Sequence, residues 1–276
     1  MKRIIIFLFV ITLFSLPCYS QGKIKDAEDS LKKTSNKSSI KSQTASNKTN
    51  NRGSNFFVDM FGHLIIEAFV YSIYGIAFET PMETKHKGSH AFLTKYPYIN
   101  SNTGNYSYEW NENTEIFTTT LTNRFIFETN RLQGNHLNVD IQFLKRFGLE
   151  LDYLQLWERN HNFGDNAIAI YTALTKYHRI RTERFNGFWG LGATYVDGDV
   201  DDFGFTYALG AELFFANPMS LESNFNQTLI NSNTINSFNL LLNFYKKQYK
   251  FTGGYEHLKI GSVPFSNVSL GLGVTF

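Results

Sequence analysis

Residues 266–276 read SNVSLGLGVTF, and this stretch decides the fold. From Val268 to Phe276 every second residue is large and apolar, and each residue between them is Ser, Gly or Thr. Because successive side chains of a β-strand point to opposite faces, the alternation predicts a strand with one apolar face and one small, polar face.

A strand of this kind that ends on an aromatic residue resembles the C-terminal strand of Gram-negative outer-membrane β-barrels. The resemblance implies that the protein lies in the cell outer membrane, in contact with outer-membrane lipid and lipopolysaccharide. It also implies that the barrel-insertion machinery recognises the strand ending at Phe276. The resemblance is to a class of proteins and indicates no ligand.

The beginning of the chain agrees with this compartment. Residues 1–20 have a basic start, an apolar run over residues 4–16 and a small-x-small site at Cys18-Tyr19-Ser20, which predicts a cleaved signal peptide. Acylation of Cys18 is an alternative, although Pro17 fits that motif poorly. Cleavage removes the single cysteine, which excludes disulfide and thiolate chemistry in the mature chain.

The composition fits a barrel better than a helical membrane protein. The chain has 27 Phe and 15 Tyr among 276 residues, yet hydrophobic residues make up only 42%. No long apolar run free of charge follows the signal peptide. A membrane barrel needs none, because its apolar residues occupy alternate positions.

From residue 114 onward, alternating segments are separated by turn residues, which predicts an all-β fold: an antiparallel transmembrane β-barrel over residues 114–276. We expect about ten strands, with eight or twelve as alternatives. An even number places both barrel ends on the periplasmic side. The faces of the fourth segment are ambiguous, and the ten segments are 115–129, 136–145, 147–158, 166–178, 185–196, 203–216, 219–229, 235–245, 249–260 and the terminal strand.

Three further segments precede the barrel. Residues 21–54 are basic, polar and free of aromatic residues, which predicts a disordered linker. Residues 55–79 predict an amphipathic helix that lies against the membrane or under the barrel. Residues 80–113 form a bridging segment that could be a plug, a periplasmic cap or an extra strand pair.

Two sets of side chains are weak candidates for metal binding. Asp59, His63 and Glu67 share one helix face, either as a metal site or as a polar stripe. The loop at residues 197–202 resembles a calcium loop but lacks its glycine, so it is either a divalent-cation site or a solvated loop; its acidic residues are Asp197, Asp199, Asp201 and Asp202.

If the large apolar residues face lipid, nine charged residues face the lumen. Buried charges need partners, so we expect an ionic network with Arg124 and Lys250 as its hubs. The network either fills the barrel or lines a narrow pore. Its members are Arg124, Glu128, Asp140, Glu150, Asp152, Glu212, Glu222, Lys250 and Glu256.

The sequence does not favour an enzyme. His257-Leu258-Lys259 resembles the His-x-Ser stretch of lipid A deacylase barrels, but lysine replaces the nucleophile. His161 and Asp165 lack the partners that the outer-membrane proteases use. No phosphate-binding loop or nucleic-acid motif is present, and we expect no cofactor.

These observations lead to one functional hypothesis and two alternatives. We expect an outer-membrane barrel with a filled polar lumen and a structural, adhesive or envelope-maintaining role. The first alternative is a narrow channel for ions or small solutes. The second is a hydrolase that acts on lipid or protein.

Overall fold

A computed structural model describes residues 22–32, 91–100, 104–129, 131–143, 146–159 and 165–276. The predicted signal peptide and the predicted helix at 55–79, with Asp59, His63 and Glu67, lie outside the described residues. So do residues 33–54 of the predicted linker and the first part of the bridging segment.

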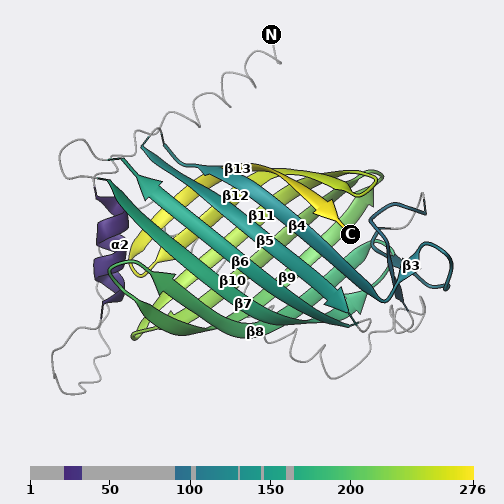
Figure 1. The fold of residues 1–276 in the computed structure, drawn as a ribbon, viewed down its shortest axis with the longest axis horizontal. Coiled ribbons are helices and arrows are strands. Elements are labelled where there is room, and N and C mark those ends of the chain that lie inside the picture. The colour runs from purple at the N-terminus through teal and green to yellow at the C-terminus, as the bar shows by residue number, and fades with distance from the viewer. Residues whose placement is uncertain (1–21, 33–90, 101–103, 130, 144–145, 160–164) are drawn as a thin grey trace, which may run out of the picture.

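Ten strands close into a barrel in which every neighbouring pair is antiparallel (Figure 1). The last strand pairs with the first barrel strand, from Val268 opposite Phe127 to Thr275 opposite Thr120. The prediction of a ten-stranded antiparallel barrel is confirmed. Its strands are β4 (Phe117–Phe127), β5 (Leu132–Phe143), β6 (Phe147–Glu158), β7 (Asn166–Arg181), β8 (Phe185–Asp197), β9 (Asp202–Ala216), β10 (Met219–Ile230), β11 (Asn233–Lys246), β12 (Tyr249–Ile260) and β13 (Val263–Thr275).

The two faces of the terminal strand lie as the alternation predicts. Leu270 is 71% exposed on the outside of the barrel, whereas Ser269 is fully buried in the lumen. Aromatic side chains on the outer surface contact one another near both ends of the strands, as in the girdles of membrane barrels. One set is Tyr153, Tyr171, Tyr195 and Phe203, and the other is Phe143, Phe147, Tyr177 and Trp189.

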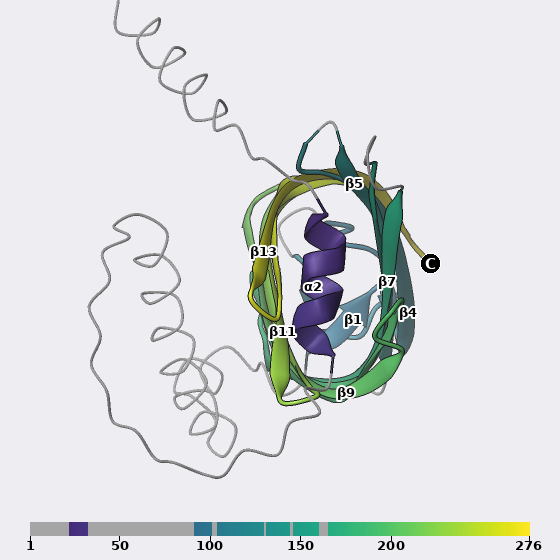
Figure 2. The same cartoon turned by 90° about the vertical axis from the view of Figure 1, so that its left-hand side faces the viewer.

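A short helix, α2 (Lys23–Leu31), crosses one end of the barrel (Figures 1 and 2). The prediction of disorder is therefore wrong for this part of the 21–54 segment. Ile24, Ala27 and Leu31 are spaced three and four residues apart, which gathers them on one buried face. Within the described residues, no helix has the length and hydropathy needed to cross a membrane.

The lumen beneath α2 is lined by apolar side chains, which we call the apolar cup. These residues and the three apolar residues of α2 form one continuous buried cluster. The interior of a membrane barrel is otherwise polar, so the cup is a distinct zone of this lumen. The cup consists of Ile126, Leu132, Leu154, Leu156, Ile168, Ile170, Val196, Ile230, Ile235, Leu258, Ile260 and Phe265.

A small antiparallel sheet lies at the opposite end, where the chain terminates (Figure 1). Its strands are β1 (Phe92–Thr94), β2 (Tyr106–Ser107) and β3 (Thr114–Glu115), in the order β2-β1-β3. The hydroxyl of Tyr106 is buried and donates to Asn186 Oδ1 over 3.1 Å. Arg181 Nη1 donates to the carbonyl of Ala91 over 2.9 Å. The described part of the bridging segment therefore packs on the barrel as a separate sheet and adds no barrel strand.

Candidate functional site: the polar lumen

The middle of the lumen contains ion pairs that join strands around the barrel. The first is built on Arg124, whose Nε lies 2.7 Å from Oε1 of Glu256. His136 lies between two carboxylates, with Nδ1 2.7 Å from Glu256 Oε2 and Nε2 2.8 Å from Asp152. Arg124 Nη2 also lies 2.6 Å from His136 Nδ1, so this ring nitrogen faces both the guanidinium and the Glu256 carboxylate. The cluster brings Arg124 and His136 to two carboxylates.

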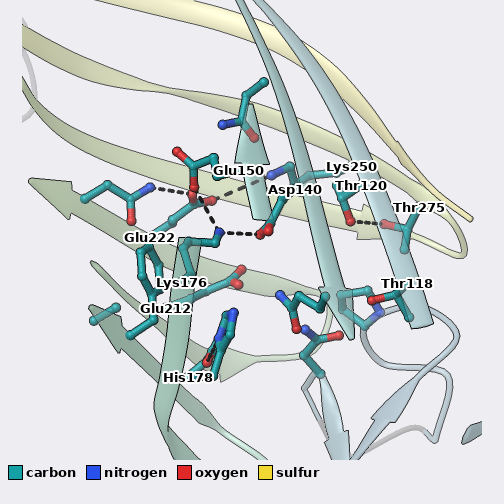
Figure 3. A pocket seen from close by; sticks show the side chains of 18 of the residues that line it. Thr118, Thr120, Asp140, Glu150, Lys176, His178, Glu212, Glu222, Lys250 and Thr275 are labelled. Carbon is teal, nitrogen blue, oxygen red and sulfur yellow. Dashed lines mark hydrogen bonds and ion pairs between the residues drawn. The ribbon is translucent and has the colours of Figure 1, made fainter. Parts of the chain in front are cut away.

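A second cluster surrounds Lys176, which comes from β7 and is almost completely buried. Its Nζ lies 2.8 Å from Asp140 Oδ2 and 2.9 Å from Glu150 Oε2. Figure 3 shows the ammonium group pointing at the carboxylates across the cavity. The ring of Phe188 packs under the same ammonium, with 4.5 Å from Nζ to the ring centroid. Lys176 on β7 is therefore ion-paired with one carboxylate on β5 and one on β6.

A third cluster holds two glutamates on β9 and β10. Glu212 Oε1 accepts from the hydroxyls of Ser220 and Tyr245, over 2.5 and 2.6 Å. Glu222 Oε2 accepts from Asn243 Nδ2 over 2.9 Å, and Lys250 Nζ lies 3.6 Å from the same oxygen. Neutral donors thus supply most of the partners here.

A row of threonine hydroxyls continues the polar packing across β7, β8, β9 and β10. Thr172 and Thr194 are 2.8 Å apart, Thr194 and Thr206 are 2.6 Å apart, and Thr206 and Thr228 are 2.8 Å apart. Each hydroxyl can donate to one neighbour and accept from another. The row therefore lines the wall of the lumen over these four strands with hydrogen-bonded side chains.

One cavity among these clusters is small. A cavity of about 80 Å³ is lined by the Lys176 and Glu222 clusters, by His178, and by Pro97 and Asn105 from the segment that carries the small sheet. A cavity needs only ~10–15 Å³ of this kind of volume to hold one water, so a few waters fit. The cavity is too small for a sugar or an amino acid, and α2 and the small sheet lie at the two ends of the lumen.

Most of the nine predicted lumen residues lie in these clusters. Glu128 is the exception: it lies at the barrel rim, where Oε1 accepts from Lys23 and from the backbone N–H of Ser266. The prediction that Lys250 is a hub of the network is wrong, because its ion pair with Glu222 is long, at 3.6 Å. Lys176 occupies the central position that we expected for Lys250.

Lys176 and His136 were not predicted as site residues. Lys176 shares its face with Thr172 and Leu174, and β7 carries both apolar and polar residues on that face. The face is mixed because the strand also reaches the apolar cup, where its residues Ile168 and Ile170 are packed. The strand register would have revealed Lys176, because it places Lys176 opposite Gly148, two residues before Glu150 on the same face of β6.

The acidic loop contacts α2. The backbone N–H of Asp199 donates to Glu28 Oε1 over 2.9 Å, and the Asp199 carboxylate lies 3.3 Å from Lys32 Nζ. The Asp201 carboxylate accepts from the hydroxyl of Tyr195 over 2.5 Å. Among the described residues, no group of three or more His, Cys, Asp and Glu side chains is arranged to hold a metal ion. Asp199 and Asp201 thus contact neighbouring side chains, and Asp202 Oδ1 accepts from the backbone N–H of Phe203.

The neighbourhood of His257 differs from the sequence-based expectation. A hydroxyl is present, but it comes from the adjacent strand: Ser266 Oγ lies 3.2 Å from His257 Nδ1, and the Tyr255 hydroxyl contacts both. In the part of the chain that the structure describes, no carboxylate is hydrogen-bonded to His257. The acid that orients the base in a Ser-His-Asp triad is therefore missing. Asp165 lies at the rim, and His161 is outside the described residues.

No protein-family description and no curated protein matches the sequence. In structure, the chain is similar to the KdgM porin in complex with disordered oligogalacturonate, with 11% identity, 57% of this chain and 99% of that chain covered, and a TM-score of 0.38. An outer-membrane channel from Pseudomonas putida F1 shows 11% identity, 58% and 95% coverage and a TM-score of 0.39. Ail, the attachment invasion locus protein of Yersinia pestis, shows 15% identity, 58% and 96% coverage and a TM-score of 0.30. At these identities the similarity concerns the fold alone.

The outer surface of the barrel shows directly why it belongs in a membrane. Large apolar side chains are exposed along the strands, including Leu270, Leu272 and Phe205 at 71%, 62% and 53%. Exposing apolar surface to water costs a free energy of ~25 cal/mol per Å², and contact with lipid removes this cost. The closed sheet and its apolar outer surface are those of a transmembrane β-barrel, the fold predicted from the terminal strand.

Proposed function

We propose that this outer-membrane protein is a closed barrel with a structural, adhesive or envelope-maintaining role, rather than a pore. The observation that carries the proposal is that buried ion pairs around Arg124 and Lys176 join five strands along the lumen wall, beside a cavity of about 80 Å³. An ion that crosses this level must separate buried charge pairs, which is costly in a medium of low dielectric constant.

The proposal includes an orientation. The connections at the α2 end include residues 159–165 and 198–201, whereas those at the other end include the short turns at residues 217–218 and 247–248. Membrane barrels have short periplasmic turns and longer extracellular loops. We therefore assign α2 and the acidic loop to the cell exterior. The end of the C-terminal strand is then on the periplasmic side, from which the insertion machinery acts.

The alternative is a narrow channel for ions or small solutes. The cavity of about 80 Å³ beside Lys176 favours it, because this cavity already occupies part of a transmembrane path. Liposome swelling separates the two functions. Vesicles that contain the full chain should swell in isotonic solutions of arabinose or glycine no faster than protein-free vesicles. Faster swelling, with gel migration showing that the barrel is folded, would establish the channel and refute the closed barrel.

A further inference from the structure

The turns at the two ends of the barrel carry opposite charge. The four turns at the end of the small sheet hold four basic residues and one acidic residue, a net charge of +3. The five turns at the α2 end hold two basic and four acidic residues, a net charge of −2. In the orientation proposed above, the basic turns face the phospholipid head groups of the periplasmic leaflet. The basic set is residues 144–146, 182–184, 217–218 and 247–248, and the acidic set is residues 128–131, 159–165, 198–201, 231–232 and 261–262.

Arg146 ends the turn between β5 and β6 and lies next to aromatic side chains of the outer surface. Its guanidinium carbon is 5.8 Å from the centroid of the Tyr177 ring, within the range of a cation–π contact. Tyr177 contacts Phe147 and Trp189, with 5.6 and 5.7 Å between the ring centroids. Aromatic residues on the outside of a membrane barrel mark the boundary between lipid and water. The Arg146 guanidinium therefore lies at that boundary.

The protein satisfies only part of this guanidinium group. Nη1 of Arg146 donates to the backbone carbonyl of Arg179 over 3.4 Å, which is long for a hydrogen bond. Within the part of the chain that the structure describes, Arg146 forms no ion pair with a carboxylate. A guanidinium group carries five N–H donors, so several of them remain available to a ligand outside the chain.

A lipid phosphate has the chemistry that this position requires. Guanidinium and phosphate groups form two parallel, charge-assisted hydrogen bonds. Because Arg146 has no carboxylate beside it, a head group with its own ammonium would find no counter-charge there, which favours an anionic head group. Apolar side chains continue toward the membrane centre on the strands at both sides of β7. Leu151 on β6 and Leu191 on β8 are 43% and 46% exposed, at the level of the acyl chains.

We propose that Arg146 binds the phosphate of an anionic phospholipid, such as phosphatidylglycerol, in the periplasmic leaflet. Tyr177 and Phe147 hold the guanidinium at the level of the head groups, and the outer faces of β6 and β8 contact the acyl chains. The inference rests on the orientation given under the proposed function. It goes beyond that function, because it assigns a lipid-binding site to the outer surface of the barrel.

The test measures which lipids contact Trp189. The chain has three tryptophans, so the Trp110→Phe/Trp157→Phe protein retains Trp189 as its one reporter. This reporter protein is folded into phosphatidylcholine vesicles that contain a fraction of brominated lipid, because bromine quenches tryptophan fluorescence at short range. Brominated phosphatidylglycerol should compete for the site about fivefold better than brominated phosphatidylcholine, the ratio expected for one basic residue at a membrane surface.

Two variants separate the site from the general charge of the basic turns. Arg146→Gln in the reporter protein should lower the ratio to about one. Lys247→Gln removes the same charge from the turn between β11 and β12, three strands away from β8, and should leave the ratio unchanged. Inorganic phosphate in excess should also leave the ratio unchanged, since a free ion gains no contact with the apolar outer surface.

Three results would overturn the proposal. The first is equal quenching by the two brominated lipids in a reporter protein whose gel migration shows a folded barrel. The second is the same loss of preference in Lys247→Gln as in Arg146→Gln. The third is loss of the preference when inorganic phosphate is added, which would make this an ion site. Both leaflets of the vesicles have the same lipids, so quenching tests the site in either orientation of the barrel. Failure of the closed barrel is read separately, from swelling.

Discussion

Arg124 Nε and Glu256 Oε1 lie 2.7 Å apart, with both side chains buried in the lumen. Arg124 is on β4 and Glu256 is on β12, and the terminal strand β13 lies between them. The pair therefore bridges the seam at which the last strand of the sequence meets the first strand of the barrel. This ion pair therefore links strands on the two sides of the seam, inside the lumen.

Replacing Arg124 with leucine should destabilise the barrel. Glu256 and His136 would lose a buried partner, and breaking a buried pair on one side costs about 3–5 kcal/mol. Urea unfolding in lipid vesicles, followed by tryptophan fluorescence, measures the change in the free energy of unfolding. The double variant Arg124→Leu/Glu256→Leu should recover most of the loss, because no unpaired carboxylate remains. Equal losses in the single and double variants would show that the pair is not the cause.

Glu28→Gln should strengthen the docking of α2 at neutral pH. Desolvation, and to a smaller extent the nearby Asp199 carboxylate, raises the pKa of Glu28 above its ordinary value. A group with a raised pKa favours the docked state below its unfolded pKa, and this contribution is lost as pH rises through the docked pKa. Hydrogen exchange of the α2 amides should therefore be slower in Glu28→Gln at pH 7.

The pH dependence provides the control for that prediction. At acid pH the protonated Glu28 resembles glutamine, so the exchange rates of the two proteins should converge as the pH falls. Comparing the two proteins at each pH cancels every pH effect that is common to both. Faster exchange in Glu28→Gln at neutral pH would show that the carboxylate holds the helix in place.

Arginine on the outer surface should cost most at the middle of the membrane. Leu270 lies near the middle of β13 and is 71% exposed, whereas Leu229 lies one residue from the end of β10. In bilayers, Leu270→Arg should lower the free energy of unfolding by about 2–4 kcal/mol, and Leu229→Arg by about 0–1 kcal/mol. Folding titrations into vesicles measure both. Equal costs at the two positions would contradict the membrane placement.

The barrel could be predicted because its signal is repeated along the chain. The alternation of Val268, Leu270 and Leu272 with small residues follows from the environments of the two sheet faces, and similar segments recur ten times. Acidic residues placed between lipid-facing residues could likewise be assigned to the lumen. The local pattern was sufficient because each strand has lipid on one side.

The pairings within the lumen and the position of α2 could not be predicted in this way. Lys176 lies on a strand that runs from the apolar cup to the polar clusters, so its inner face has no uniform character. Ile24, Ala27 and Leu31 have helical spacing, but lysines and acidic residues surround them. Their helix depends on a surface built from residues more than 90 positions later in the sequence. Ser266 similarly reaches His257 through strand pairing.

Single-channel recording of the full chain in a planar bilayer tests the closed lumen most directly. Gel migration before and after heating first establishes that the inserted barrel is folded. The Arg124 and Lys176 clusters should then prevent ion flow, so the account predicts no discrete conductance steps at either polarity. Regular unitary steps that grow in proportion to the salt concentration would contradict it, because they require an open aqueous path past both clusters.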